Sequence, residues 1–120
     1  MKESRVQDIA RVALSRAGAT MFRNNCGIAE HWTPRGVQRV RYGLAEGSAD
    51  LVGLVDGRFV AVEVKAHDGR ISAEQEQWLA LVRRSGGFAA VLRGPVTDDE
   101  IAVQRACMDI VARARAGASE

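Results

Sequence analysis

The feature that most constrains the fold is a pair of apolar segments joined by a two-residue turn. Residues 49–55 read ADLVGLV and residues 58–65 read RFVAVEVK, with Asp56-Gly57 between them. An Asp-Gly pair between alternating apolar segments is among the strongest sequence signals for a β-hairpin. The sequence therefore predicts two antiparallel strands in tight register, with Val55 opposite Arg58.

This register has a consequence for the charged residues of the hairpin. Counting outward from the turn, Asp50 lies opposite Glu63, and Lys65 follows on the same face of the second strand. Like charges directly opposite each other destabilise a sheet. A bound divalent cation removes that cost, and two carboxylates are hard oxygen ligands that suit Mg²⁺ or Mn²⁺. The alternative is a solvated hairpin face on which Lys65 neutralises both acids, and the residue pattern alone leaves both readings open.

The remaining segments predict helices and strands on either side of this hairpin. We expect residues 26–46 to be mainly irregular, with at most a short strand at 38–42, and a connection of that length favours a functional loop. The order α-β-β-β-α-β-α predicts a single α/β domain over residues 1–120, with helices packed against a mixed sheet. The expected helices are 3–17, 73–85 and 97–115, the last beginning at a capping box in TDDE (97–100), and the expected outer strands are 20–25 and 88–93.

Composition narrows the class of protein. The chain has 120 residues, 47% of them apolar and 27% charged, with a net charge of +2. It contains no apolar run of the roughly 18 to 20 residues that a membrane span needs, and its amphipathic start does not resemble a signal peptide, so we expect a cytoplasmic protein. Almost all the cationic residues are Arg, which binds phosphate through two parallel hydrogen bonds. Cys26 and Cys107 are too isolated to predict a zinc site.

Several segments occur in an order that is typical of one family. They are ESRVQ, FRNNCG, GSAD…EVK and GRISAEQEQWLALVRRSGGFAAVLR, spread over residues 3–93. Together they resemble the virus-type replication-repair nuclease (VRR-NUC) domain, a branch of the PD-(D/E)xK nuclease superfamily, whose signature is G-x-x-D…E-x-K. The superfamily often has Pro before the Asp, where this chain has Ala49. The resemblance implies a restriction-endonuclease-like core and a metal-dependent nuclease that acts on DNA.

The resemblance also implies roles for the hairpin residues. Asp50 and Glu63 resemble the family's metal ligands, and the backbone carbonyl of Val64 is expected to add a third. Lys65 resembles the catalytic Lys, which positions the attacking water or stabilises developing negative charge. The cation would polarise a phosphoryl oxygen and lower the pKa of a bound water.

Helical residues are expected to complete the site. Glu3 and Gln7 lie one turn apart on the helical side that faces the sheet, so we expect Glu3 to reach the metal directly or through water and Gln7 to contact the site or the substrate. The alternative for Glu3 is an acid that complements the helix dipole. Gln75 resembles the Gln that follows E-x-K in the family. Its alternative is a capping box with Ser72.

A DNA-contacting surface is expected along the long connection before the hairpin. Gly47 would let a backbone or a phosphate approach close to Asp50. Basic side chains interleaved with aromatic ones suit phosphate and base contacts, although a solvated loop would look the same. The residues concerned are Arg23, Arg35, Arg39 and Arg41, with Trp32 and Tyr42 among them.

The resemblance implies hydrolysis of phosphodiester bonds. Small stand-alone members resemble resolvases of branched DNA, and a four-way junction has two-fold symmetry that suits a homodimer. The sequence therefore predicts a homodimeric junction or flap endonuclease of phage or prophage origin. Two alternatives stay open: a non-catalytic DNA-binding or interaction module with the same fold, and a restriction-type endonuclease that cuts one short sequence.

Overall fold

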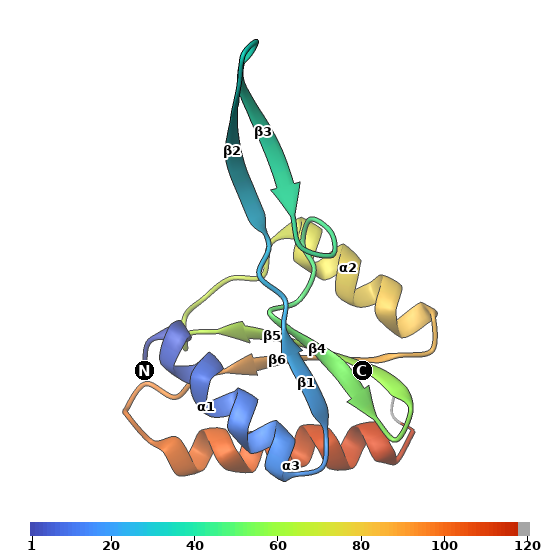
Figure 1. Ribbon diagram of the computed structural model, residues 1–120. Coiled ribbons are helices and arrows are strands. Elements are labelled where there is room, and N and C mark those ends of the chain that lie inside the picture. Colours follow the sequence, from blue (N-terminus) through green and yellow to red (C-terminus); the bar gives the residue numbers. More distant parts are fainter. Residues whose placement is uncertain (118–120) are drawn as a thin grey trace.

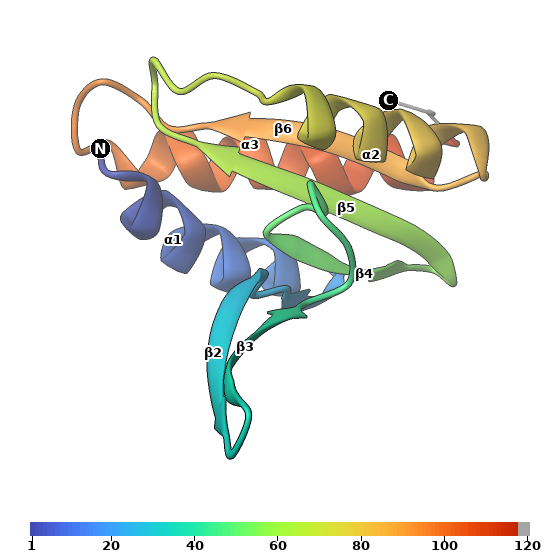
Figure 2. The same ribbon diagram turned by 90° about the horizontal axis from the view of Figure 1, so that it is seen from above.

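A four-stranded mixed sheet forms the centre of the protein (Figures 1 and 2). The computed structural model describes residues 1–117. The strand order is β1-β4-β5-β6, in which β5 and β6 are parallel and the other neighbours are antiparallel. The strands are β1 (Thr20–Arg23), β4 (Leu51–Val55), β5 (Arg58–Lys65) and β6 (Phe88–Arg93).

Helices cover both faces of this sheet. α1 (Glu3–Arg16) and α3 (Glu100–Arg115) pack on one face, and α2 (Ala73–Arg84) packs on the other (Figure 2). Because side chains alternate along a strand, the valines of β5 at 60, 62 and 64 enter the larger core beneath α1 and α3, whereas Ala61 enters the smaller core beneath α2. Glu63 and Lys65 therefore lie on the α2 side of the sheet, and the predicted α/β fold with a mixed sheet is confirmed.

The β4–β5 hairpin has the register that its sequence predicts. Val55 pairs with Arg58, and Leu51 pairs with Val62. Asp56 (φ 49°) and Gly57 (φ 81°) both adopt positive φ, as a type I′ turn requires. One step beyond the last paired residues, this register places Asp50 opposite Glu63.

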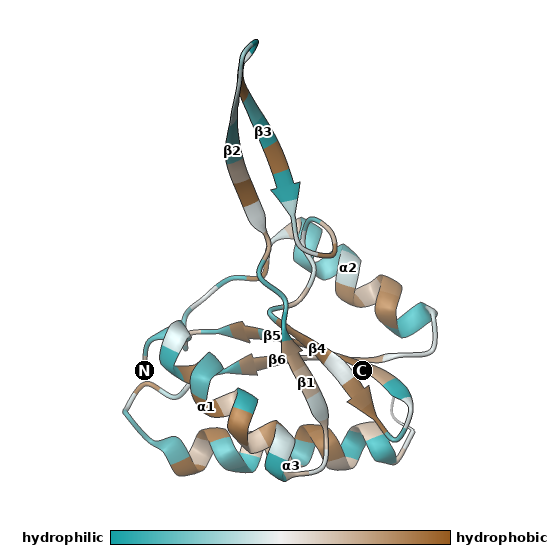
Figure 3. Ribbon diagram, in the orientation of Figure 1, coloured by the Kyte–Doolittle hydropathy of each residue, from teal (hydrophilic) through white to brown (hydrophobic). Residues whose placement is uncertain are grey.

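A second, two-stranded sheet projects from the core as a separate arm, residues 27–42 (Figure 1). It consists of β2 (Gly27–Thr33) and β3 (Gly36–Tyr42), joined by Pro34 and Arg35. The expectation of a mainly irregular segment at 26–46 was wrong. Neither face of the arm packs on the core, so polar and apolar residues are mixed on both faces, as Figure 3 shows, and the alternation that marks a half-buried strand is lost.

The last helix begins later than its sequence indicates. The N-cap is Asp99, whose Oδ1 accepts a hydrogen bond from the Ala102 N–H at 3.1 Å, so the expected capping box at 97–100 is wrong. The preceding Asp98 pairs with Arg5 of α1 at 2.6 Å. Within residues 1–117, no helix has the length and apolar character needed to cross a membrane.

Candidate active site

The two hairpin carboxylates meet at the carboxyl end of β5. Asp50 precedes β4, and its Oδ2 accepts a hydrogen bond from the Val64 N–H at 2.8 Å. The N–H and C=O of one strand residue point to the same neighbouring strand, so the Val64 carbonyl also faces Asp50. Glu63 is 2% exposed, on the side of the sheet that α2 covers. The structure thus brings together the three predicted ligands Asp50, Glu63 and Val64.

Glu63 is held by polar contacts on one oxygen only. Gln75 Nε2 donates to Glu63 Oε1 at 3.1 Å, and Lys65 Nζ lies 3.9 Å from the same atom. The Lys65 side chain is itself only 12% exposed. Glu63 Oε2 is buried and has no hydrogen-bond partner among residues 1–117. A buried carboxylate oxygen without a partner is costly, so this atom points to a missing ligand.

The electrostatics of Glu63 reflect the same arrangement. Burial raises its pKa from the ordinary value of 4.5 to about 8, and the neighbouring carboxylate of Asp50 adds to the rise. Lys65 acts in the opposite direction, and the more distant charge of Glu3 acts with Asp50. Asp50 and Glu63 therefore repel each other when both are ionised, and a cation between them would relieve that repulsion.

The donor set fits a hard divalent cation. Mg²⁺ is usually bound through one or two carboxylates and keeps several waters, which matches two acids and one carbonyl. No three His, Cys, Asp or Glu side chains in residues 1–117 are grouped closely enough to form a complete protein site. Asp50 and Glu63 would therefore hold the ion together with Val64 and water.

The residues of α1 lie near this site without joining it. Glu3 is exposed at the start of α1, and its charge raises the pKa of Glu63 although α1 packs on the other face of the sheet. Gln7 is half-buried one turn later. Arg5 fixes this end of the helix, because it pairs with Glu100 of α3 at 2.6 Å. Glu3 is thus placed within electrostatic range of Glu63.

Gln75 satisfies both of its predicted roles at once. Its backbone N–H donates to Ser72 Oγ at 3.1 Å, and its Oε1 accepts from the Ser72 N–H at 2.9 Å, which is a complete capping box. Its Nε2 is thereby turned towards Glu63. The cap fixes the orientation of the Gln75 amide, so the N-terminal end of α2 positions the Glu63 carboxylate.

Gly47 makes a close approach, but to α2. It has φ of 80°, and a Cβ there would lie 2.4 Å from the Glu74 carbonyl oxygen. A side chain at this position would push the loop that carries Asp50 away from α2. The backbone that approaches Gly47 closely is therefore that of α2 within the protein.

The predicted DNA-contacting arginines are all exposed. Arg39 and Arg41 lie on β3, Arg35 lies at the turn of the arm, and Arg23 ends β1. Arg41 is 3.7 Å from Glu46. The arginines of the arm are thus spread along a ribbon that projects from the core, whereas the carboxylates lie within it.

Sequence reasoning missed one residue that contacts the site. The Asn24 N–H donates to the Asp50 carbonyl at 2.8 Å, and its side chain bonds the two residues before Asp50. A lone Asn after a short strand gives no periodic signal. The one signal in the sequence is that FRNNCG resembles the family's segment after the first helix.

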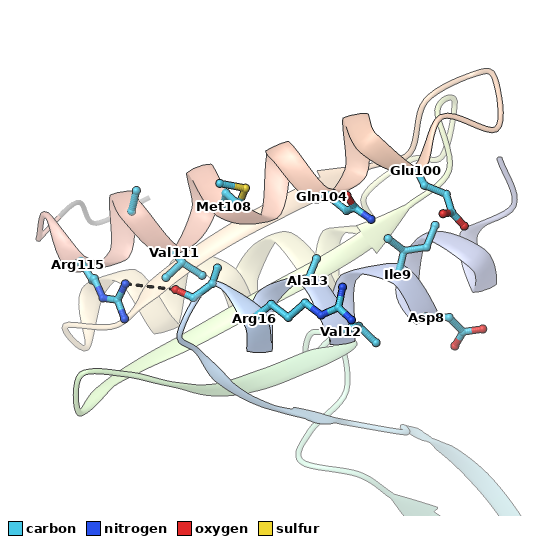
Figure 4. A pocket seen from close by; sticks show the side chains of 12 residues that line it. Asp8, Ile9, Val12, Ala13, Arg16, Glu100, Gln104, Met108, Val111 and Arg115 are labelled. Atoms are coloured by element: carbon cyan, nitrogen blue, oxygen red, sulfur yellow. Dashed lines mark hydrogen bonds between the residues drawn. The ribbon is translucent and has the colours of Figure 1, made fainter.

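A separate groove lies on the outer side of α1 and α3 (Figure 4). Its volume is about 590 Å³, and it holds none of the predicted site residues. Val12 and Met108 are exposed in it. Asp8 and Glu100 lie towards one end and Arg115 towards the other, with the Arg16 side chain between them. This groove is therefore separate from the carboxylates, across the sheet from α2.

Comparison with known proteins places the chain in a family. No curated protein matches it. Residues 23–95, more than half of the 120 residues, match the family model of the VRR-NUC domain. The matched range includes Asp50, Glu63 and Lys65, and it leaves out α1 with Glu3 and Gln7. VRR-NUC domains are nuclease-type domains that typically use divalent metal ions, and this chain belongs to the VRR-NUC family.

Proposed function

We propose that the protein is a metal-dependent DNA endonuclease that hydrolyses phosphodiester bonds. One observation carries the proposal: Glu63 Oε2 is buried without a partner among residues 1–117 while Asp50 lies against the same carboxyl group. A cation between the two acids supplies the missing partner and offsets their repulsion. Membership of a nuclease-type family supports a catalytic role for that cation.

We assign a separate role to each residue of the site. Asp50, Glu63 and the Val64 carbonyl would hold Mg²⁺ or Mn²⁺, with Glu3 contributing through water. The bound ion supplies Lewis-acid chemistry at the scissile phosphate. Lys65, on the same strand face as Glu63, orients the attacking water or stabilises charge on the phosphate. Gln75 keeps Glu63 in place through its amide.

The arm is the proposed DNA-contacting surface. Arg35, Arg39 and Arg41 outnumber its single acid, Glu30, so phosphates are attracted to it. Trp32 is 76% exposed near the turn, where an aromatic ring stacks on bases. The remaining proposed contacts are Arg23 at the end of β1, Gly47 in the loop before Asp50 and Gln7 of α1.

We further propose branched DNA as the substrate and a homodimer as the acting form, in the cytoplasm. Two copies related by a two-fold axis match the symmetry of a four-way junction. The groove between α1 and α3 suits a second copy, because its apolar residues are exposed and its ends carry opposite charges. Contact there leaves the carboxylates and the arm open.

A cleavage assay tests the function. Supercoiled plasmid, a four-way junction and linear duplex are incubated with the protein and Mg²⁺, Mn²⁺ or chelator. We expect metal-dependent nicking, faster on the junction, and none from Glu63→Gln. If the protein binds DNA equally well with and without chelator and cleaves it under no condition, it is a non-catalytic module. Cutting of linear duplex at one short sequence would identify a restriction-type endonuclease.

A further inference from the structure

Two chain segments connect the arm to the sheet, and Asn24 ties them together. The first segment is 24–26 and the second is 43–50, which ends at Asp50. Asn24 Nδ2 donates to Ser48 Oγ at 2.7 Å and to the Ala49 carbonyl at 2.8 Å, and Asn24 Oδ1 accepts from the Leu44 N–H at 3.2 Å. The side chain of one residue thus spans the second segment almost from end to end.

The backbone of Asn24 reaches Asp50 itself. Its N–H donates to the Asp50 carbonyl at 2.8 Å, one step beyond the pairing of Arg23 with Leu51. Asp50 is therefore fixed on two sides, by Asn24 through its carbonyl and by Val64 through its carboxylate.

The second segment has little freedom to move independently. Ser48 is 8% exposed, and its Oγ lies 2.9 Å from Cys26 Sγ and donates to the Ala45 carbonyl at 2.7 Å. A Cβ at Gly43 would lie 2.8 Å from the Cα of Cys26. The segment lies between residues 24–26 and α2, and the three hydrogen bonds of the Asn24 side chain help to hold it there beside Asp50.

We infer that Asn24 is a positioning residue that holds the metal-binding carboxylate of Asp50 and joins it to the arm as one unit. Only an amide fits the role, because Asn24 uses a donor towards Ser48 and Ala49 and an acceptor towards Leu44. This inference rests on the proposed nuclease function. Residues that orient metal ligands change metal affinity or activity by about 10- to 100-fold when they are removed.

The test compares Asn24→Ala with Asn25→Ala, the same change at the neighbouring exposed position. Mn²⁺ affinity is measured by calorimetric titration without DNA, and kcat and KM are measured on a four-way junction. For Asn24→Ala we expect Mn²⁺ affinity and kcat to fall by about 10-fold or more, with KM changed less than about 3-fold because the arginines of the arm remain. Asn25→Ala should match the wild type.

A second variant covers the case in which Asn24→Ala fails to fold. Ser48→Ala removes one of the two acceptors of Asn24 Nδ2, and we expect a smaller loss of Mn²⁺ affinity in the same direction. If the wild type binds Mn²⁺ and cuts, and the folded variants bind Mn²⁺ as Asn25→Ala does, the inference is wrong and the proposed function stands. A wild type that neither binds Mn²⁺ nor cuts overturns both.

Discussion

Replacing Glu63 with Gln should stabilise the protein in the presence of chelator, by an amount that grows with pH. In the unfolded chain the carboxyl ionises near its ordinary pKa of 4.5, whereas the folded state keeps the proton up to about pH 8. Between these values the unfolded state binds fewer protons, so the free energy of unfolding falls as pH rises. The slope is about 1.4 kcal/mol per pH unit, which amounts to about 3 kcal/mol by pH 7.

Gln at position 63 removes this dependence because it carries no titrating proton. It keeps the size of the side chain and an oxygen that can accept from Gln75. We therefore expect wild type and Glu63→Gln to differ little at pH 4.5, and Glu63→Gln to be the more stable by about 3 kcal/mol at pH 7. Below pH 4.5 both states of the wild type are protonated, and the difference should stay constant.

Urea unfolding in EDTA at a series of pH values measures the difference. Glu30→Gln, which removes an exposed acid of the arm, is the matched control, and its effect should stay within about 0.5 kcal/mol at every pH. A difference between wild type and Glu63→Gln that does not change between pH 4.5 and 8 would refute the reasoning. Added Mn²⁺ should narrow the difference at pH 8, because an ion at 100 times its Kd stabilises the wild type by about 2.7 kcal/mol, against a difference of about 4 kcal/mol at that pH.

Three further perturbations separate the parts of the site. Lys65→Ala should lower the single-turnover cleavage rate by about 100-fold or more and keep Mn²⁺ affinity, and a rate within a few-fold of wild type would contradict its role. The double variant Arg39→Ala, Arg41→Ala should weaken binding to all DNA sequences, measured by fluorescence anisotropy. The slope of log affinity against log salt concentration should fall by about 0.9 for each phosphate that the arm no longer neutralises. An unchanged slope would mean that DNA binds to another surface. Gln75→Ala should lower Mn²⁺ affinity by about 10-fold in calorimetry, because Glu63 loses its amide donor. Affinity equal to that of the wild type would mean that Gln75 acts only as a cap of α2.

The hairpin that carries the carboxylates could be predicted because all its signals are local. The turn type follows from Asp56-Gly57, and the alternation of β5 follows from its valines. Both agree on one register, so the opposition of Asp50 and Glu63 follows from the sequence alone. The burial of Glu63 could not be predicted, because it depends on α2 covering that face of the sheet.

The arm and Asn24 could not be predicted for the same physical reason. Strand signals in a sequence come from one face packing on a core, and the arm has no such face. The side chain of Asn24 bonds residues 20 to 25 positions away, so its contacts exist only once the segments before and after the arm lie side by side. Gln75 shows the opposite case, in which a local motif and a long-range contact coincide and neither excludes the other.

The cost of Glu63 to the fold is itself an argument about function. A loss of about 3 kcal/mol at pH 7 is a large share of the roughly 5 to 15 kcal/mol by which domains are typically stable. A neutral side chain of similar size would avoid the loss, and Gln75 could still donate to it. Neither the core valines nor the capping box needs a carboxylate at this position. The acid would be explained by a ligand that binds it, and the second carboxylate beside it, that of Asp50, would favour a cation as proposed above.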